Sequence, residues 1–292
     1  MSPSALRLAP ITALLVSACA LSPAEPVGPP AKETIHAVTA SGRLLSFNAG
    51  QPQKILASKP LAGLGSGDRL VGIDYRVAKG QLFGLGASGQ LYRIDAATAA
   101  ATAIGSPVAL PEGREFGVDF NPTVDRIRVV SDAGFNLRLH PDTGAVVDAN
   151  PAQAGVQFDG RLAYDSADRM TGHAPRIVAA GYTYNKDNEK ITTNYALDGA
   201  TGTLVQQGTK EGVAPAVSPN TGRLYTVGLL GTGPFERATL DISDVSNTAY
   251  AGIGTSANTP TRWYRIDLAS GAARFIGTVG GGEPIIGSAI EP

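Results

Sequence analysis

The stretch VGIDYRVAKGQLFGLGASGQLYRIDAATAAATAIG, residues 71–105, decides the fold because a close copy of it occurs later in the chain. ATLDISDVSNTAYAGIGTSANTPTRWYRIDLASGAARFIG, residues 238–277, aligns with it, with Asp74 over Asp241, LYRID over WYRID and one insertion between them. Each copy contains four apolar runs separated by turn residues, and the runs alternate with the period of two that indicates β-strands. Repeated four-stranded units of this size are typical of β-propeller blades.

Two further units extend the repeat. FGVDFNPTVDRIRVVSDAGFNLRLHPDTGAVV spans 116–147, and another unit begins at RLAYD (161), passes through RIVAAGYTYN and TTNYALDGATG, and reaches TLVQQG. Starts near 71, 116 and 161 give a spacing close to 45 residues. We therefore predict an all-β propeller with four-stranded blades, and a β-sandwich with chance similarity is the alternative.

The two ends of the chain complement each other. Residues 34–58 match the last three strands of a unit but lack the first, and PIIGSAI, residues 284–290, supplies a first strand where the chain stops. This predicts that the N- and C-terminal strands pair in one blade, which closes the ring and removes two exposed sheet edges. A β-sandwich does not predict such complementary ends. Residues 34–292 are thus expected to form a single propeller domain.

The number of blades depends on APAVSPNTGRLYTVGLLG, residues 214–231. It could begin an extra blade or add a hairpin to the preceding unit. Only about 26 residues separate its start from the next clear unit, too few for four strands of five to six residues with their turns. Five blades are favoured, with six as the alternative.

Composition limits the classes of partner. The chain has 24 basic and 25 acidic residues for a net charge of −1, so it has no field that would gather nucleic acid or coat an anionic membrane. With 43% apolar residues it can bury a sizeable core. We expect a monomer that does not bind nucleic acid.

The N-terminus predicts export and lipid anchoring. Residues 1–18 combine Arg7 with the short apolar run LAPITALLVSA, the pattern of a signal peptide, and VSAC resembles the bacterial lipobox, in which Cys19 is lipidated after cleavage. An ordinary cleavage within ACALSPA, with Cys19 incidental, is the alternative. Cys19 is the only cysteine, so it has no disulfide partner. Ala20, by resemblance to bacterial sorting rules, favours the outer membrane facing the periplasm, so membrane contact is expected only through the lipid.

Residues 19–33 are predicted to be a tether. They contain Pro23, Pro26, Pro29 and Pro30. Proline-rich chain favours the extended polyproline conformation, which makes a spacer of roughly 40 Å.

The stretch FNPTVDRIRVVSDAGFNLRLHPDTG, residues 120–144, places arginines where a buried sheet usually has Val. Alternate side chains of a strand share a face. The three neighbouring strands expected in this stretch therefore set an acid, two guanidiniums and an amide side by side. One hypothesis is a salt-bridge network between blades, since buried charges must be paired. The other is a site for an anionic or polar ligand at one mouth of the channel. The residues of that site would be Asp74, Arg76, Asp119, Asn121, Arg126, Arg128, Asn136 and Arg138.

A calcium loop is a further hypothesis. DFNPTVD places oxygen ligands at alternate positions, but Val124 and Val130 stand where the Gly and Glu of an EF-hand loop belong. An NP turn between strands explains the same letters. Apart from this possible calcium, no cofactor is expected. The candidate metal ligands are Asp119, Asn121, Thr123 and Asp125.

Other motifs indicate no chemistry. GLGASG (84–89) satisfies G-x-G-x-x-G but leads into a strand rather than a helix, so we interpret it as a hairpin turn. His36, His140 and His173 do not have metal-ligand spacing.

GIDYR, FGVDFNPTVDRIRVVSDAGFNLRLHPDTG and YRIDLASGAARFIG resemble the bacterial envelope proteins grouped as domain of unknown function 4394, over roughly residues 34–290. The resemblance implies a propeller-like fold and an exported protein, and it carries no catalytic residue.

These observations predict a lipid-anchored envelope propeller that acts as a binding or scaffolding module for an envelope protein or a small polar ligand. The alternative is a lactonase-like hydrolase, with Asp74, Asp119, Asp125 or a divalent ion near the channel mouth. Carboxylates that converge would favour the hydrolase, and polar groups paired with arginines would favour the binding module.

Overall fold

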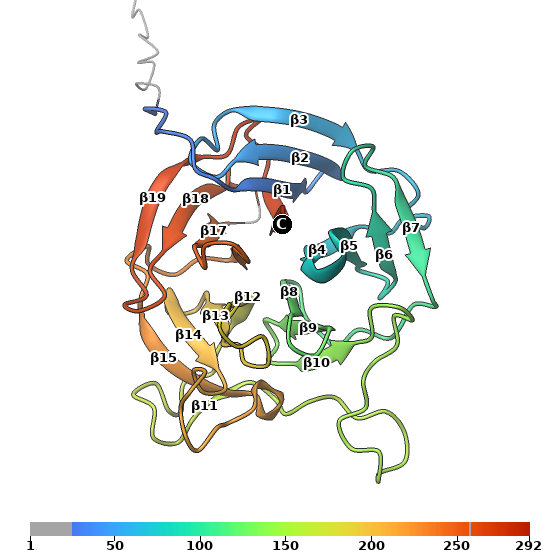
Figure 1. Ribbon diagram of the computed structural model, residues 1–292, viewed down its shortest axis with the longest axis vertical. Helices are drawn as coiled ribbons and strands as arrows, with labels where there is room; N and C mark the ends of the chain where they lie inside the picture. The colour runs from blue at the N-terminus through green and yellow to red at the C-terminus, as the bar shows by residue number, and fades with distance from the viewer. Residues whose placement is uncertain (1–24, 257) are drawn as a thin grey trace, which may run out of the picture.

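The computed structural model describes residues 25–256 and 258–292, in which five β-sheets stand around one axis as the blades of a propeller (Figure 1). The signal peptide and Cys19 lie outside the described residues. No helix in the described part of the chain has the length and apolar character needed to cross a bilayer.

The blades follow one another along the chain, each starting with its innermost strand. The first blade contains β20 (Ile285–Ile290), β1 (Thr34–Thr39), β2 (Arg43–Asn48) and β3 (Ile55–Pro60). The second contains β4 (Leu70–Arg76), β5 (Gln81–Gly86), β6 (Leu91–Ile94) and β7 (Ala101–Ile104). The third contains β8 (Phe116–Asn121), β9 (Arg126–Ser131) and β10 (Asn136–Leu139).

The fourth and fifth blades complete the ring. The fourth contains β12 (Ile177–Tyr182), β13 (Asn194–Asp198), β14 (Thr203–Gln207) and β15 (Arg223–Leu229), with the short β11 (Ala163–Tyr164) at its outer edge. The fifth contains β16 (Arg237–Ile242), β17 (Ala249–Gly254), β18 (Arg262–Ile266) and β19 (Ala273–Thr278).

The predicted closure of the ring is confirmed. Strand β1 pairs antiparallel with β20, and Ile35 lies opposite Ile290 in the register. Both isoleucines are buried, as is Ile285 at the other end of β20. The two ends of the chain therefore form one sheet, and the edge of β1 is covered.

The structure corrects the position of the fourth blade. Its innermost strand is β12, which begins at Ile177, whereas RLAYD at 161 contributes only β11, paired parallel with β15. Strand β15 comes from the segment 214–231 and forms the outer antiparallel strand of this blade, so the ring has five blades. The third blade lacks a regular fourth strand and has only an isolated bridge between Leu139 and Val146. The even spacing of 45 residues thus breaks at a long connection between β10 and β12.

The core lies between the blades. Trp263 on β18 packs edge-on against Phe47 of the first blade and stacks on Tyr250, with ring centroids 5.2 and 6.0 Å away. Near the axis there is no room for larger side chains, since a Cβ on Gly117 would lie 2.6 Å from the backbone nitrogen of Ala180 in the next blade. These contacts hold the innermost strands at fixed positions.

Residues 25–33, which we call the seam segment, lie along the seam between the first and fifth blades. The backbone N–H of Thr278 donates to Glu25 Oε2 at 2.7 Å, and Ala31 N donates to Asn48 Oδ1 at 2.8 Å. Gln51 Nε2 donates to the carbonyl of Gly28 at 2.8 Å. This part of the predicted tether therefore belongs to the folded ring, and the domain begins before residue 34.

Candidate functional site

Three aspartates meet at the axis of the ring. Asp74 lies on β4, Asp119 on β8 and Asp241 on β16, and each sits at the same level of its innermost strand. One carboxylate oxygen from each lies within 4.8 Å of the other two, and all three side chains are buried. We call this group the aspartate triad.

Each member of the triad joins its own blade to the next one. Its carboxylate accepts a hydrogen bond from a backbone N–H on the neighbouring innermost strand, so the triad links the second, third and fifth blades to their successors. The bonds are Phe120 N to Asp74 Oδ2 at 2.6 Å, Tyr182 N to Asp119 Oδ1 at 3.0 Å and Ile290 N to Asp241 Oδ2 at 2.6 Å.

Positive charge that would offset the three carboxylates is scarce around the triad. No basic side chain of residues 25–256 and 258–292 forms an ion pair with any of the three carboxylates. Burial raises the pKa of Asp74 well above its usual value, and the charge of Asp241 raises it further. Burial, then Asp74 and Asp241, raise the pKa of Asp119 in the same way. Burial raises the pKa of Asp241 to about 7. At neutral pH the triad must therefore share protons or hold a cation.

Little space adjoins the triad. The cavity next to it along the axis measures about 10 Å³ and is lined by residues of all five innermost strands, including Gly72, Gly117 and Gly287. Burial, and then the charges of the three carboxylates, raise the pKa of Tyr184. A space of this size holds about one water molecule. This space can therefore hold a proton-sharing water molecule or a small cation next to the triad.

A second polar site, the arginine cleft, opens between the third and fourth blades. It has a volume of about 310 Å³ and is lined by Arg126 and Arg128 of β9, Arg138 of β10, Tyr182 of β12, and the turn that carries Asn220. Because Arg128 and Arg138 face each other in the β9–β10 register, their side chains share one face of the sheet.

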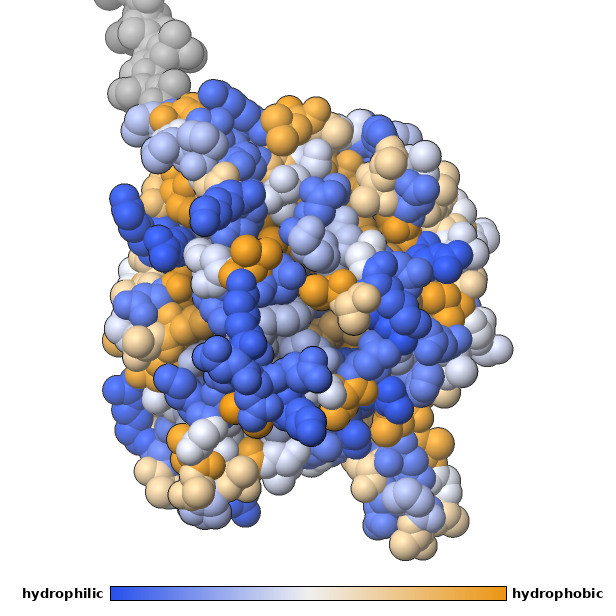
Figure 2. All heavy atoms as spheres, viewed as in Figure 1, coloured by the Kyte–Doolittle hydropathy of each residue, from blue (hydrophilic) through white to orange (hydrophobic). Residues whose placement is uncertain are grey.

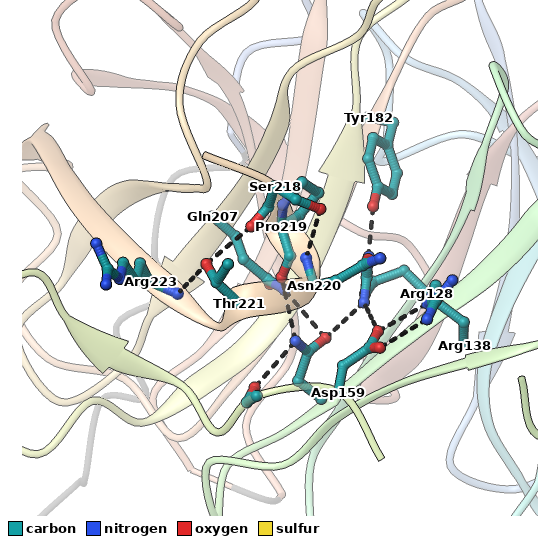
Figure 3. A network of polar contacts seen from close by, with 12 residues as sticks. Arg128, Arg138, Asp159, Tyr182, Gln207, Ser218, Pro219, Asn220, Thr221 and Arg223 are labelled. Atoms are coloured by element: carbon teal, nitrogen blue, oxygen red, sulfur yellow. Dashed lines mark hydrogen bonds and ion pairs between the residues drawn. The ribbon is translucent and has the colours of Figure 1, made fainter. Parts of the chain in front are cut away.

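Arg128 forms the floor of the cleft and is 2% exposed. Its Nε donates to the hydroxyl of Tyr182 at 3.1 Å and its Nη2 to Asn220 Oδ1 at 2.6 Å, so it joins the two blades (Figure 3). Its Nη1 donates to Asn136 Oδ1 and to Asp159 Oδ2. The predicted network between blades is thus present, and Arg128 is at its centre.

Asp159 connects two of the arginines (Figure 3). It comes from the long connection between β10 and β12, and its side chain is 1% exposed. Arg138 binds it with two hydrogen bonds, Nε to Oδ2 and Nη2 to Oδ1, both 2.8 Å. Arg126 has only backbone partners in the described residues, since its Nη1 donates to the carbonyls of Val124 and Asp125. Three arginines and one carboxylate leave the cleft with two positive charges.

The predicted ligand residues divide among three places. Arg126, Arg128, Arg138 and Asn121 line the arginine cleft, and Asn136 is fully buried behind it. Asp74 and Asp119 belong to the triad. Arg76 is apart from both, where it pairs with Asp125 and Asp142, and the Asp125 hydrogen bond raises the pKa of Arg76.

The oxygens proposed for a calcium loop have other partners. Asn121 Oδ1 accepts from the backbone N–H of Thr123 at 2.9 Å and from its hydroxyl at 2.8 Å, which forms a local turn. Asp125 pairs with Arg76, and Asp119 points to the axis. The structure thus shows a turn at NP, and the carboxylates that do converge come from three separate blades.

Two important residues were absent from the predicted site. Asp241 could have been found, because it aligns with Asp74 in the repeat. Asp159 could not, because it lies in a connection without periodicity or motif, and only the fold brings it between Arg128 and Arg138.

Figure 2 shows that hydrophilic residues gather around the middle of the ring face seen in Figure 1, with hydrophobic residues in small scattered patches. The first half of GLGASG is the end of β5, and its second half lies in the hairpin turn that joins β5 to β6.

Comparisons with known proteins find a matching family and solved structures of distant likeness. The family described as a domain of unknown function, DUF4394, matches residues 43–289. No curated protein matches the chain. Among solved structures, Myxococcus xanthus glutaminyl cyclase has a TM-score of 0.45 at 12% identity and covers 87% of this chain and 100% of its own. TolB from Acinetobacter baumannii has a TM-score of 0.43 at 12% identity, over 84% of this chain and 53% of its own. Likeness at this level carries no information about activity.

Proposed function

The chain belongs to the DUF4394 family, and we propose that it is a lipid-anchored, periplasm-facing binding propeller that takes a small anionic ligand in the arginine cleft. The observation that carries the proposal is the charge of that cleft. Three arginines line a space of about 310 Å³, and only Asp159 opposes them.

The free donors of the cleft suit an anion. Arg138 uses Nε and Nη2 on Asp159, so its Nη1 has no partner in the described residues, and the same holds for Nε and Nη2 of Arg126. Guanidinium groups offer several N–H donors in a fixed planar fork, which matches carboxylate and phosphate oxygens. Arg128 and Asp159 hold the floor rigid, so the open donors are preorganised.

A neighbouring side chain adds unmet hydrogen-bonding capacity. Asn194 lies between Tyr182 and Gln207 in the register of the fourth blade, on the face that contacts Arg128 and Asn136. It is 2% exposed, and neither its amide oxygen nor its nitrogen has a partner in the described residues. A buried amide without partners is costly, which supports an additional polar occupant between these blades.

The cleft is suited to binding rather than catalysis. Guanidinium groups stay protonated at all ordinary pH values, so they cannot serve as general acids or bases. The one carboxylate, Asp159, is 1% exposed and already accepts from both Arg128 and Arg138. The arrangement therefore supports recognition of charge and shape.

Calorimetric titration with inorganic phosphate and succinate, and with glucose as the neutral probe, tests the ligand class. We expect the anions alone to bind, and the substitutions Arg126→Gln and Arg138→Gln each to weaken binding about tenfold or more, because hydrogen bonds to charged groups contribute about 1.5–3 kcal/mol. Arg223→Gln is the matched control, because Arg223 begins the outer strand β15, pairs with Asp165 and is not part of the cleft lining. Binding of glucose, or anion binding that both cleft variants retain, would contradict the proposal.

The lipid anchor is tested separately. Replacement of the thiol in Cys19→Ser is expected to move the protein from the membrane fraction to the soluble periplasmic fraction. Unchanged membrane partition would remove the anchor from the proposal and leave the ligand site untouched.

A metal-dependent hydrolase is the second candidate, favoured by the convergence of Asp74, Asp119 and Asp241 within 4.8 Å. Carboxylate oxygens are the ligands that calcium prefers. If this candidate is right, calcium raises the melting temperature, chelator lowers it, and Asp119→Asn abolishes both shifts. Melting curves that do not respond to calcium or chelator would eliminate it.

A further inference from the structure

The structure holds a second basic cleft, on the outer seam of the ring. It measures about 280 Å³ and is lined by the seam segment at residues 28–31, by Tyr250, and by Arg265, Arg274 and Phe275 of the fifth blade. We call it the seam cleft. It is separate from the arginine cleft, which lies between the third and fourth blades.

Two arginines of the seam cleft face each other, and neither has an ion-pair partner among the described residues. Arg265 on β18 and Arg274 on β19 are direct partners in the register, and both are exposed. In residues 25–256 and 258–292 neither guanidinium has a hydrogen bond or an ion pair. Like charges directly opposite each other destabilise a sheet. An anion that lies against the pair removes this repulsion.

The repeat shows that this pair is particular to the fifth blade. In the second blade the equivalent of Arg265 is Arg93, and its partner in the register is Thr102. The two blades thus differ at this position, which is Arg274 in the fifth blade and Thr102 in the second. The second blade forms the same pair of strands with Thr102 at this position. The blade therefore does not need an arginine there in order to fold.

Nearby acids are already engaged. Glu33 accepts hydrogen bonds from the hydroxyls of Ser246 and Tyr250, at 2.7 and 3.1 Å. Asp267 accepts from the backbone N–H of Ala269 at 2.8 Å in the β18–β19 turn. Neither forms an ion pair with Arg265 or Arg274, although the charge of Arg265, after the hydrogen bond from Ala269 N, helps to lower the pKa of Asp267. Among the described residues, the lining of the cleft itself holds the two arginines and no acidic side chain.

The short chain between Cys19 and the seam segment would hold this cleft close to the membrane. Gly28 is the ninth residue after Cys19, and nine residues of extended chain span about 30 Å. The seam segment from Glu25 onward is held against the ring, which shortens the free part of the spacer. A lipid on Cys19 therefore keeps the seam, with its exposed Phe275, near the headgroup layer.

From this geometry we infer that the seam cleft, through Arg265 and Arg274, binds the phosphate headgroups of anionic phospholipids and lays the propeller edge-on against the bilayer. The inference rests on the proposed lipid anchor. In this orientation the two faces of the ring, with the arginine cleft, are free to meet ligands from the periplasm.

The test uses residues 25–292, which contain the closed ring with its seam segment and lack the lipid. Flotation with phosphatidylcholine vesicles, with and without phosphatidylglycerol, is expected to show binding only when phosphatidylglycerol is present. Each of Arg265→Gln and Arg274→Gln should weaken it about fivefold, the factor that corresponds to about 1 kcal/mol per basic residue near an anionic membrane. The matched control, Arg223→Gln, should bind like the unaltered ring.

Three outcomes would overturn the inference: equal flotation with both vesicles, no flotation with either, or flotation that the Arg265→Gln and Arg274→Gln variants retain. Soluble glycerol phosphate distinguishes a free ligand, because protection from melting by this compound without any vesicle binding would assign the cleft to a small molecule. Failure of the lipid anchor appears in the Cys19→Ser fractionation after a wash at high salt, because salt releases a protein held by headgroup charges but not one held by a lipid.

Discussion

The substitution Asp119→Asn tests how the ring tolerates three buried carboxylates. The amide oxygen it introduces can still accept the hydrogen bond from Tyr182 N, which Asp119 accepts through Oδ1 at 3.0 Å. Its amide N–H groups can donate toward Asp74 and Asp241. The change therefore removes one charge and keeps the shape of the site.

The size of the effect follows from the separation of the carboxylates. Two charges 4.8 Å apart repel by about 3 kcal/mol at an effective dielectric constant of about 20. The triad avoids this repulsion by keeping protons, and each retained proton costs about 1.4 kcal/mol for every pH unit above the usual aspartate pKa near 3.9. Near pH 8 the cost of one proton reaches about 6 kcal/mol.

The pH dependence has a definite sign. The folded-state pKa values of Asp74, Asp119 and Asp241 are raised, mainly by burial. The folded protein therefore binds more protons than the unfolded chain, so stability is highest near pH 4 and falls as the pH rises through the folded pKa values. For Asp241 this window extends to about 7.

We expect Asp119→Asn to raise the free energy of unfolding by about 2 to 6 kcal/mol near pH 8 and by less than about 2 kcal/mol near pH 5. Urea unfolding in the presence of chelator, followed by the fluorescence of Trp263, measures both values. Trp263 is the only tryptophan and is 1% exposed, so it reports loss of the core. Asp187→Asn, in the exposed β12–β13 loop, is the matched control. A variant that is less stable than the unaltered protein at both pH values would refute the reasoning.

Other substitutions test the network, the axis and the closure. Arg128→Met should lower the free energy of unfolding by about 3–5 kcal/mol, because Asp159 then loses a partner while it stays buried; a loss below about 1 kcal/mol in urea unfolding would contradict this. Gly117→Ala should cost about 1–3 kcal/mol because its Cβ meets backbone of the next blade, whereas Gly254→Ala, with more room, should cost less, and equal losses would argue against tight packing at the axis. Deletion of β20 should expose the edge of β1 and cause aggregation in size-exclusion chromatography, so a soluble monomer would speak against ring closure.

Most of the architecture could be predicted from the repeat. The ring closure followed from two incomplete ends, because a missing innermost strand at residues 34–58 and an unmatched strand at 284–290 have one simple solution. The start of the fourth blade could not be placed, because RLAYD has the alternation of a strand but pairs only at the outer edge, as β11. Short apolar runs do not reveal which strand they will join.

The site was less predictable than the fold. Alternation correctly placed Asp119, Arg128 and Arg138 in line across β8, β9 and β10. It could not show that Asp119 turns to the axis while Arg128 takes Asp159 as its partner, because that choice depends on contacts between blades. The tether was expected to stand free, yet Glu25 binds Thr278 through side-chain and backbone contacts that have no local pattern.

The central claim is that the arginine cleft binds an anion, and the most direct test is a crystal structure of residues 25–292 grown with inorganic phosphate. We predict density for the anion in the cleft, within hydrogen-bonding distance of Arg126 and Arg138, with Asp159 still bound to Arg128. An empty cleft, or phosphate found only at other arginines, would contradict the account.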